Sequence, residues 1–277
     1  MHNISVVVCT KNEGARIDDC LQSVLMNNPS EIIVVDGMSA DDTAERARKY
    51  ADKVIVSKAG SLCADRQVGI DNASCEFIAM IDADHRLEKG SLLALVNDLH
   101  ELDLDMVQSQ LRMYQVKGFW DKAEDEMWQL NHNHVGEKEM IGTAPAIYKK
   151  EIFQQVRFEP ETTPTIDDTD FIYRLKRDTN FKIGVGRATV MQHHFSSFHD
   201  YYKKFMWYGY GDGEFCRKHP SRALSMIYHL AIRYSFIYPI KALVKGKLNA
   251  SLFCCIQGLV RIAGLLKYFL FSGRSAT

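Results

Sequence analysis

Apolar runs and amphipathic stretches alternate through the first 85 residues of the chain. The runs are short and rich in β-branched residues, which predicts strands buried on both faces of a parallel sheet. Between the first two runs, apolar residues from Ile17 to Leu25 recur at helical spacing, and Ser39 followed by Asp42 resembles a capping box. The expected strands are residues 4–9, 31–35, 54–56 and 77–81, and the expected helices are residues 17–25, 39–50 and 62–73.

This alternation predicts an α/β fold with a mostly parallel sheet and helices on both of its faces. Ligands of such sheets bind beyond the carboxyl ends of the strands. The polar residues just after the expected strands are therefore the first candidates for chemistry: Thr10, Asn12, Glu13, Asp36, Asp82 and Asp84. Beyond residue 100 the pattern predicts extended segments at 104–115, 142–148 and 182–191, helices at 119–130 and 171–176, and a loop at 159–169.

Charge is distributed unevenly along the chain. The 277 residues have a net charge of −1, but residues 201–277 hold 12 Lys and Arg and only two acids, Asp212 and Glu214. This tail is therefore +10 and the rest of the chain −11, an asymmetry that indicates an anionic surface as a partner. The seven cysteines show no Cys-x-x-Cys spacing. Neither a disulfide framework nor a structural zinc site is expected, and a reducing cytoplasm fits best.

The basic tail is also apolar. Its longest charge-free run, residues 248–260, has 13 residues, whereas a helix that crosses a bilayer needs about 20. The tail therefore predicts helices that lie in the membrane interface, with the apolar side inward and the basic side toward anionic headgroups. The alternative is a helical subdomain packed on the core, or an interface between subunits of an oligomer.

The pair Asp82-x-Asp84 is the sharpest chemical signal. Two carboxylates after a buried strand can hold Mg²⁺ or Mn²⁺, which prefer oxygen ligands, and such a cation can bridge the phosphates of a nucleotide. The same pattern recurs at 103/105 and 168/170, but only the first pair directly follows a buried strand. The competing interpretation is a solvated turn that caps the next helix near Gly90.

Other candidates are weaker when each is taken alone. Asp36 ends a strand and is either a ligand-binding acid or a turn residue, and Arg66 on a helix is more often a solvated surface residue. The acids within 167–170 suit a general base or a metal site, or they form the acid-rich start of a helix. The neutral imidazole of His193 or His194 can ligate a metal, or it can be a buried core side chain.

The order of these segments resembles the family 2 glycosyltransferases, which have the GT-A fold. The resemblance covers about residues 3–213 and depends on the ordered set rather than on one motif. No P-loop, dinucleotide-binding glycine motif or Gly-x-Ser-x-Gly elbow competes with it. The matching segments are 5–13 (SVVVCTKNE), 32–43 (IIVVDGMSADDT), 64–69 (ADRQVG), 77–84 (FIAMIDAD), 167–175 (DDTDFIYRL) and 190–193 (VMQH).

The resemblance implies roles for the matching residues. Asp84 would ligate a divalent metal, Mn²⁺ or Mg²⁺, with His193 or His194 as a further ligand. Asp168 would be the catalytic base, in an Asp-Asp pair where relatives usually have Glu-Asp. The base, ribose and diphosphate of a nucleotide-sugar donor would be contacted by Thr10, Glu13, Asp36 and Arg66, with Asp82 near the ribose or the metal.

The resemblance extends to the segment after the histidines. Residues 208–211 (YGYG), with Lys203 and Lys204 nearby, resemble the loop that closes over the donor in relatives. The catalytic domain would then span residues 1–213, and the basic, apolar helical tail would span residues 214–277.

The implied function is inverting sugar transfer in the synthesis of bacterial surface polysaccharide or lipopolysaccharide. The donor in such relatives is most often a UDP-sugar, and the acceptor would be a hydroxyl of a glycan or of a lipid-linked glycan. No nucleic acid partner is expected, and the location would be cytoplasmic, peripheral on the inner face of the cell membrane. The alternatives are a polyprenyl-phosphate sugar transferase, a sugar nucleotidyltransferase and a non-catalytic scaffold that binds nucleotide-sugars.

Overall fold

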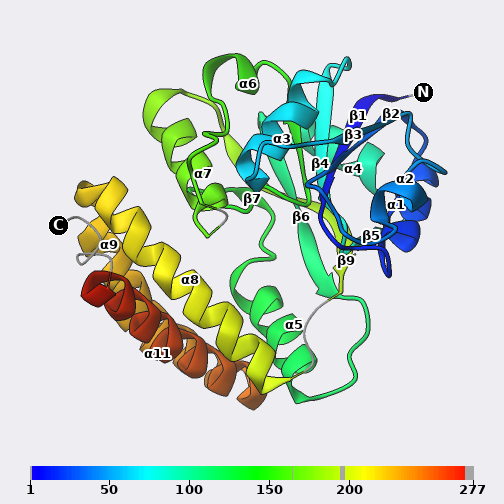
Figure 1. Ribbon diagram of the computed structural model, residues 1–277. Helices are drawn as coiled ribbons and strands as arrows, with labels where there is room; N and C mark the ends of the chain where they lie inside the picture. The colour runs from blue at the N-terminus through cyan, green and yellow to red at the C-terminus, as the bar shows by residue number, and fades with distance from the viewer. Residues whose placement is uncertain (1, 164, 194–196, 272–277) are drawn as a thin grey trace. The chain divides into compact units, whose positions relative to one another are not determined.

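The computed structural model describes residues 2–163, 165–193 and 197–271 (Figure 1). The chain divides into two compact units. The first contains Met1–Tyr114 and Asn133–His193, and the second contains Gln115–His132 and His194–Thr277. Residue 213, the predicted domain boundary, lies inside a helix of the second unit, α8 (Phe198–Lys218).

The first unit is built on a nine-stranded sheet with the order β3-β2-β1-β4-β8-β6-β9-β5, in which β7 also pairs with β9. The four strands predicted within the first 85 residues are confirmed as β1 to β4. The strands are β1 (His2–Thr10), β2 (Pro29–Asp36), β3 (Lys53–Val56), β4 (Phe77–Asp82), β5 (His85–Leu87), β6 (Met106–Met113), β7 (Gly136–Glu137), β8 (Ala146–Lys149) and β9 (Ile183–Gln192).

The sheet is mixed rather than parallel throughout. Strands β1 to β4 pair with one another in parallel, as predicted, and β6 is parallel to β9. Strand β8 runs antiparallel between β4 and β6, and β5 runs antiparallel to β9. Only β1 to β4 are linked by the regular strand–helix alternation that parallel pairing requires, so the sequence pattern could fix the direction of those strands alone.

Helices cover both faces of this sheet because alternate side chains of its central strands point to opposite sides. Val6 and Val8 of β1 pack in one hydrophobic core, with α1 (Ile17–Leu25), α2 (Thr43–Ala47) and α4 (Ser91–Glu101). Val7 and Cys9 pack in the other core. Its helices are α3 (Leu62–Asp71), α6 (Ile152–Gln155) and α7 (Asp167–Asp178).

The described part of the second unit is helical. Its two longest helices, α8 and α11, pack closely because glycines lie where they cross: a Cβ on Gly209 would be 2.1 Å from the carbonyl oxygen of Arg261. Its elements are α5 (Phe119–Asn131), α8, the 3-10 turn η1 (Pro220–Arg222), α9 (Ala223–Tyr228), the π-helical η2 (His229–Ile237), α10 (Tyr238–Val244) and α11 (Leu248–Phe271).

One prediction about this unit is wrong. Residues 208–211, expected to form a loop that closes over a donor, lie inside the 21-residue helix α8. The loop was expected from the resemblance to relatives, and glycine is a poor helix former, at about 1 kcal/mol relative to alanine. Close helix packing outweighs this preference, since Gly209 and Gly264 of α11 approach each other at the crossing.

Candidate active site

Three neighbouring parallel strands end in polar residues at one edge of the sheet. In the register of β1 with β2, Thr10 lies opposite Asp36, and in the register of β1 with β4, Cys9 lies opposite Asp82. Carboxyl ends of parallel strands share one edge, which is where such sheets bind ligands. The structure therefore brings Thr10, Asp36 and Asp82 together, as the sequence predicted.

The loops after β1 and β2 are tied to each other. The buried carboxylate of Asp36 accepts hydrogen bonds from the backbone N–H of Ser39 at 3.0 Å and from its hydroxyl at 2.5 Å. The Ser39 Oγ in turn accepts from the backbone N–H of Asn12 at 2.8 Å. Asp36 thus organises its own turn, whereas the Thr10 Oγ1 is buried and has no hydrogen-bond partner within the described residues. Such an orphaned hydroxyl fits a group that receives a ligand.

Glu13 lies in the loop after β1, half-buried, and forms two hydrogen bonds with Arg16, at 2.7 and 2.9 Å. Burial raises the pKa of Glu13 above its usual value, and the Arg16 charge opposes that shift. Its role in donor binding stays a prediction.

The acid pair Asp82 and Asp84 lies in the tight turn between β4 and β5. Asp82 ends β4, and β5 begins at His85. Among the described residues, Asp82, Asp84 and His85 each offer a potential metal-ligating atom, all within 4.8 Å of one another. Asp84 also accepts a hydrogen bond at Oδ2 from the Gln192 amide, at 3.0 Å.

His85 supports this turn rather than offering a ligand to it. Its ring is buried, and its Nδ1 accepts a hydrogen bond from the backbone N–H of Asp82 at 3.0 Å. A neutral imidazole that accepts at Nδ1 carries its proton on Nε2. The Nε2 faces the Asp84 Oδ1 at 3.8 Å, so we infer that it presents a proton, not a lone pair, to the acid pair.

Two predicted histidines follow β9, and only one lies in the described residues. The backbone N–H of His193 donates to the Asp84 carbonyl oxygen at 2.9 Å, and its ring packs against Tyr114 at 4.3 Å between centroids. Burial lowers the pKa of His193, which favours the neutral ring. Its Nε2 is buried without a hydrogen-bond partner in the described part of the chain. His194 lies outside the described residues.

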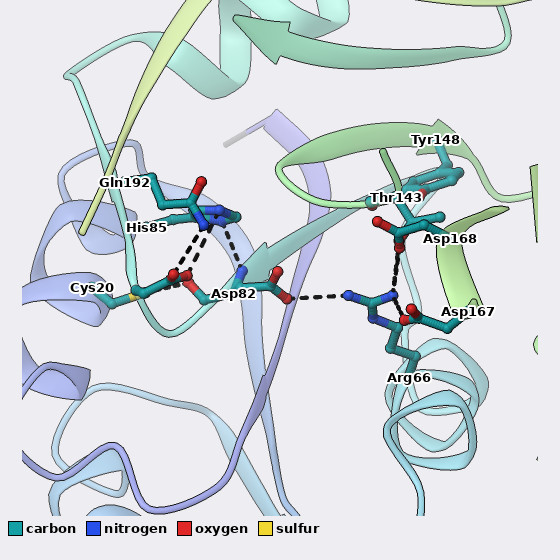
Figure 2. Close-up of polar contacts among 10 residues, drawn as sticks. Cys20, Arg66, Asp82, His85, Thr143, Tyr148, Asp167, Asp168 and Gln192 are labelled. Atoms are coloured by element: carbon teal, nitrogen blue, oxygen red, sulfur yellow. Dashed lines mark hydrogen bonds and ion pairs between the residues drawn. The ribbon is translucent and has the colours of Figure 1, made fainter. Parts of the chain in front are cut away.

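Arg66 joins the acid pair to a second group of acids (Figure 2). Its side chain extends from α3 and is only 4% exposed, so the interpretation as a solvated surface arginine is wrong. One end of the guanidinium lies 3.4 Å from Asp82 Oδ1. The other end donates to Asp167 and, at 2.9 Å, to Asp168 Oδ1. A single buried cation therefore connects the turn after β4 to the start of α7.

The two acids of α7 have different surroundings. Asp167 is buried, and burial raises its pKa although the Arg66 charge opposes the shift. Asp168 has a side chain that is 44% exposed, and its Oδ1 accepts from Arg66 and from the Thr143 hydroxyl. Its Oδ2 makes no hydrogen bond within the described residues. Asp168 is thus held in place by one oxygen and leaves the other accessible, which suits a general base.

The third acid of this group has a structural role. Asp170 is fully buried and accepts a hydrogen bond from Arg174 Nε at 2.8 Å within α7. The acids expected in a loop before a helix are thus the first turn of the helix itself. Such a position also stabilises the N-terminus of α7 through the helix dipole.

The sequence profile described as glycosyl transferase family 2 matches residues 5–177, which include the strand-end acids and the acids of α7. The chain belongs to glycosyl transferase family 2.

Curated relatives match part of this chain and a smaller part of their own length. A cholesterol galactosyltransferase of Borreliella burgdorferi is 29% identical over 120 residues, 41% of this chain and 34% of the relative. A glycosyltransferase of Rickettsia felis is 33% identical over 117 residues, 42% of this chain and 40% of the relative. The matched part thus spans little more than a third of these relatives.

Solved structures show the same fold at low identity. The Pyrobaculum calidifontis mannosyltransferase PcManGT, in complex with GDP-Man and Mn²⁺, has a TM-score of 0.62 at 14% identity, covering 96% of this chain and 87% of that one. Staphylococcus aureus TarS 1–349 has a TM-score of 0.56 at 17% identity, covering 96% and 91%. The Mycobacterium tuberculosis glucosyl-3-phosphoglycerate synthase, in complex with Mn²⁺, UDP and glucosyl-3-phosphoglycerate, has a TM-score of 0.56 at 18% identity, covering 77% of this chain and 78% of that one. These likenesses confirm the predicted GT-A-like fold.

The residues of this family 2 site fit a divalent metal. Asp82 and Asp84 supply closely spaced carboxylate oxygens, the donors that Mg²⁺ and Mn²⁺ prefer. The Gln192 amide holds one Asp84 oxygen, as the outer partners of metal ligands commonly do. The orphaned Nε2 of His193 fits a further neutral ligand, and that role stays a prediction.

Sequence reasoning missed three residues of the site. Gln192 precedes His193 directly, and His85 follows Asp84, so adjacency to the candidates was their only signal. Thr143 donates to Asp168 and accepts from Arg66 at 2.8 Å. It comes from the segment before β8, and no local pattern marked it.

We expect Arg66→Gln to destabilise the folded chain by about 3 kcal/mol, because Asp167 would stay buried without its counter-charge. A carboxyl group whose pKa is raised in the folded state stabilises the fold at low pH, and this stability is lost as the pH rises through that pKa. Removing Arg66 raises the pKa of Asp167 further, so the variant loses more stability on the way to high pH than the unchanged chain does. The deficit should therefore be larger at about pH 8 than at about pH 5.

Urea unfolding at the two pH values measures this deficit. The matched control is Arg157→Gln, an exposed arginine paired with the exposed Asp71, which should change little. Equal stability of Arg66→Gln and Arg157→Gln at both pH values would contradict the buried pairing of Arg66 with the acids of α7.

Proposed function

We propose that this chain transfers a sugar, with inversion, from a nucleotide-sugar to a hydroxyl of a glycan or lipid-linked acceptor. UDP is the expected nucleotide, and synthesis of a bacterial surface polysaccharide or lipopolysaccharide is the expected setting. The observation that supports this most strongly is the connection of two acid groups through one buried arginine. Asp82 with its neighbour Asp84 suits the donor phosphates and a metal, and Asp168 suits an acceptor hydroxyl.

The donor would bind at the edge formed by β1, β2 and β4. Asp36 keeps the turn after β2 fixed, and the orphaned Thr10 hydroxyl is available to the nucleotide. Asp82 and Asp84, with His193 as a further candidate, would hold Mn²⁺ or Mg²⁺. A bound divalent cation supplies Lewis-acid stabilisation of the negative charge on a leaving diphosphate.

The acceptor would react at Asp168. Its free Oδ2 takes the proton of the acceptor hydroxyl while Arg66 and Thr143 hold Oδ1. The hydroxyl oxygen attacks the anomeric carbon from the face opposite the nucleotide, a bond forms there, and the bond to the diphosphate oxygen breaks. The nucleoside diphosphate leaves with that electron pair, so the configuration at the anomeric carbon inverts.

Asp167 has a separate part in this mechanism. Because burial raises its pKa, Asp167 holds a proton more readily than an exposed aspartate does. Asp167 is buried and accepts a hydrogen bond from Arg66, so it lies behind the arginine and away from the exposed oxygen of Asp168. We therefore assign Asp167 to positioning Arg66 rather than to proton transfer.

A donor panel tests the reaction class. The purified full chain is incubated with UDP-, GDP- and dTDP-sugars and Mn²⁺, and the released nucleotide is identified by chromatography. We expect release of a nucleoside diphosphate from one donor class, increased by the acceptor. Release of pyrophosphate would instead indicate a nucleotidyltransferase, and donor binding without any release would indicate a non-catalytic scaffold.

The proposed location is the inner face of the cell membrane, which suits a lipid-linked acceptor. The composition of the C-terminal segment supports this: from residue 215 to the end the chain contains no Asp or Glu, while basic residues recur throughout.

A further inference from the structure

Helix α11 raises the question of how the second unit meets a membrane. Within the described residues it is the one helix, Leu248–Phe271, whose length and composition would let it cross a bilayer. Core helices of water-soluble proteins satisfy the same criterion, so length and composition alone do not decide. The contacts of α11 within its own unit do.

Arg261 lies near the middle of α11 and belongs to the interior of the helical unit. Its Nε donates to Asp212 Oδ2 at 2.9 Å and its Nη2 donates to Asp212 Oδ1 at 2.7 Å, a two-pronged pairing with α8. The two side chains are only 14% and 7% exposed. A span over Leu248–Phe271 would place this arginine near the bilayer centre, where a charge is costly. The pairing keeps α11 beside α8 instead.

Close contacts at two glycines pack the same face of α11 against neighbouring helices. A Cβ on Gly264 would lie 2.5 Å from the carbonyl oxygen of Met206 in α8, and one on Gly258 would lie 3.0 Å from the side chains of Tyr234 and Ser235. The face that carries Arg261, Gly264 and Gly258 is therefore committed to protein contacts and is not available to surrounding lipid.

The opposite face of α11 is exposed and apolar, with Leu252, Leu259 and Leu266 on it. A second segment of the same unit also presents apolar side chains outward. Residues 223–244 are continuously helical through α9, η2 and α10. Every fourth residue from 224 to 244 is a large apolar or aromatic side chain exposed by 41% to 83%. This apolar row consists of Leu224, Tyr228, Ile232, Phe236, Ile240 and Val244.

The π-helical segment explains why this row stays on one side. In an α-helix, with 3.6 residues per turn, positions four apart drift around the axis by about 40° per step. The wider π-helical turns of His229–Ile237 reduce that drift in the middle of the row. Ile227, Ile237 and Leu243 are also exposed and widen the row. Its length from residue 224 to residue 244 is about 30 Å.

Charge identifies what fits this apolar row. Exposed basic residues stand before it, at Arg217 and Lys218, and after it, at Lys245 and Lys247, of which Lys247 also pairs with Glu126 of α5. The chain has no acid from residue 215 onward. An apolar stripe flanked by positive charge is complementary to a bilayer with anionic headgroups.

We propose that the second unit is a membrane-surface module that rests its apolar row in the headgroup region of an anionic bilayer, while α11 stays inside the unit and does not cross. The proposal identifies the side chains that would hold the chain at the membrane, the location given under the proposed function. It is independent of sugar transfer, because its tests use no donor and no acceptor.

Vesicle binding tests the surface. The full chain is sedimented with phosphatidylcholine vesicles and with vesicles that also contain phosphatidylglycerol. We expect binding to the anionic vesicles, weakening as salt is added, and lost in Ile232→Glu/Phe236→Glu. The matched control is Gln154→Glu/Gln155→Glu, which adds the same charge at exposed positions of α6 in the first unit and should bind like the unchanged chain.

Two results would overturn the assignment of the apolar row. One is an unchanged chain that does not bind anionic vesicles, and the other is a double variant that binds as well as the control. If the chain forms a dimer that Ile232→Glu/Phe236→Glu dissociates, and neither form binds vesicles, the row is an interface between copies instead.

Extraction of membranes with alkaline carbonate tests the position of α11. A surface-bound chain is released by this treatment, and a chain with a crossing helix is retained, so retention of the unchanged chain would overturn the proposal. Arg261→Leu adds a second test. We expect Arg261→Leu to lower the thermal midpoint of unfolding and Asp212→Leu/Arg261→Leu to recover part of that loss. If α11 crossed the bilayer, Arg261→Leu alone would raise the midpoint instead.

Discussion

Asp168→Asn should lower kcat for sugar transfer by about 10² to 10⁴-fold, the contribution of a positioned base. The substitution keeps the shape of the side chain and an oxygen that can accept from Arg66 and Thr143. It removes the charge that draws the proton from the acceptor hydroxyl. The KM for the donor should change little, since no donor contact is assigned to Asp168. Nucleoside diphosphate release at saturating acceptor measures both quantities.

The matched control for this variant is Asp178→Asn. Asp178 ends the same helix, is exposed, and pairs with its neighbour Arg177. Its substitution should leave kcat unchanged. If Asp168→Asn stays within about tenfold of the unchanged chain, the base is another group.

The second large effect is expected at the acid pair. Asp84→Asn should weaken Mn²⁺ binding by at least about 100-fold, the upper end of the loss seen when only an outer partner of a metal ligand is removed. The amide can still accept the Gln192 hydrogen bond, so the turn between β4 and β5 should keep its shape. Transfer should fall to the level seen with EDTA. Titration of Mn²⁺ by calorimetry measures the affinity directly.

Another Asp-x-Asp pair of the chain provides the control for Asp84→Asn. Asp103 is 85% exposed and paired with Lys182, so Asp103→Asn should leave both Mn²⁺ affinity and transfer unchanged. Equal Mn²⁺ affinity in Asp84→Asn and Asp103→Asn would remove the metal role from Asp84.

The first half of the sheet could be predicted because its strands are buried on both faces and therefore read as dense apolar runs. The same runs located Thr10, Asp36 and Asp82 at strand ends, where parallel pairing brings them to one edge. The direction of β8 could not be predicted, since antiparallel pairing leaves no signature in a four-residue strand.

The side-chain contacts within the site could not be predicted from the sequence for a different reason. Whether Arg66 is solvated or buried depends on contacts made by residues about 100 positions away, at Asp167 and Asp168. Thr143 is likewise close to them only in the folded chain. The protonated nitrogen of His85 follows from one backbone hydrogen bond, which spacing alone does not reveal.

Local preference was misleading in the second unit. Residues 208–211 resemble a donor-covering loop of relatives, but here Gly209 lets α8 and α11 approach closely. The tail was correctly predicted to contain an apolar helix, α11. The charge-free run of 13 residues ends at Arg261, whose partner Asp212 lies about 50 positions earlier. Because the two residues are far apart in the sequence, no local pattern indicated the pairing that holds one face of α11 against α8.

The central claim is that acids far apart in the chain form one metal-dependent donor site, and metal-dependent nucleotide binding tests it most directly. The affinity of UDP is measured by calorimetry with Mn²⁺ and with EDTA, for the unchanged chain and for Asp84→Asn. We predict that Mn²⁺ strengthens UDP binding to the unchanged chain and has no effect on the variant. UDP affinity that is the same with and without Mn²⁺, or that Mn²⁺ strengthens equally in both proteins, would contradict the claim.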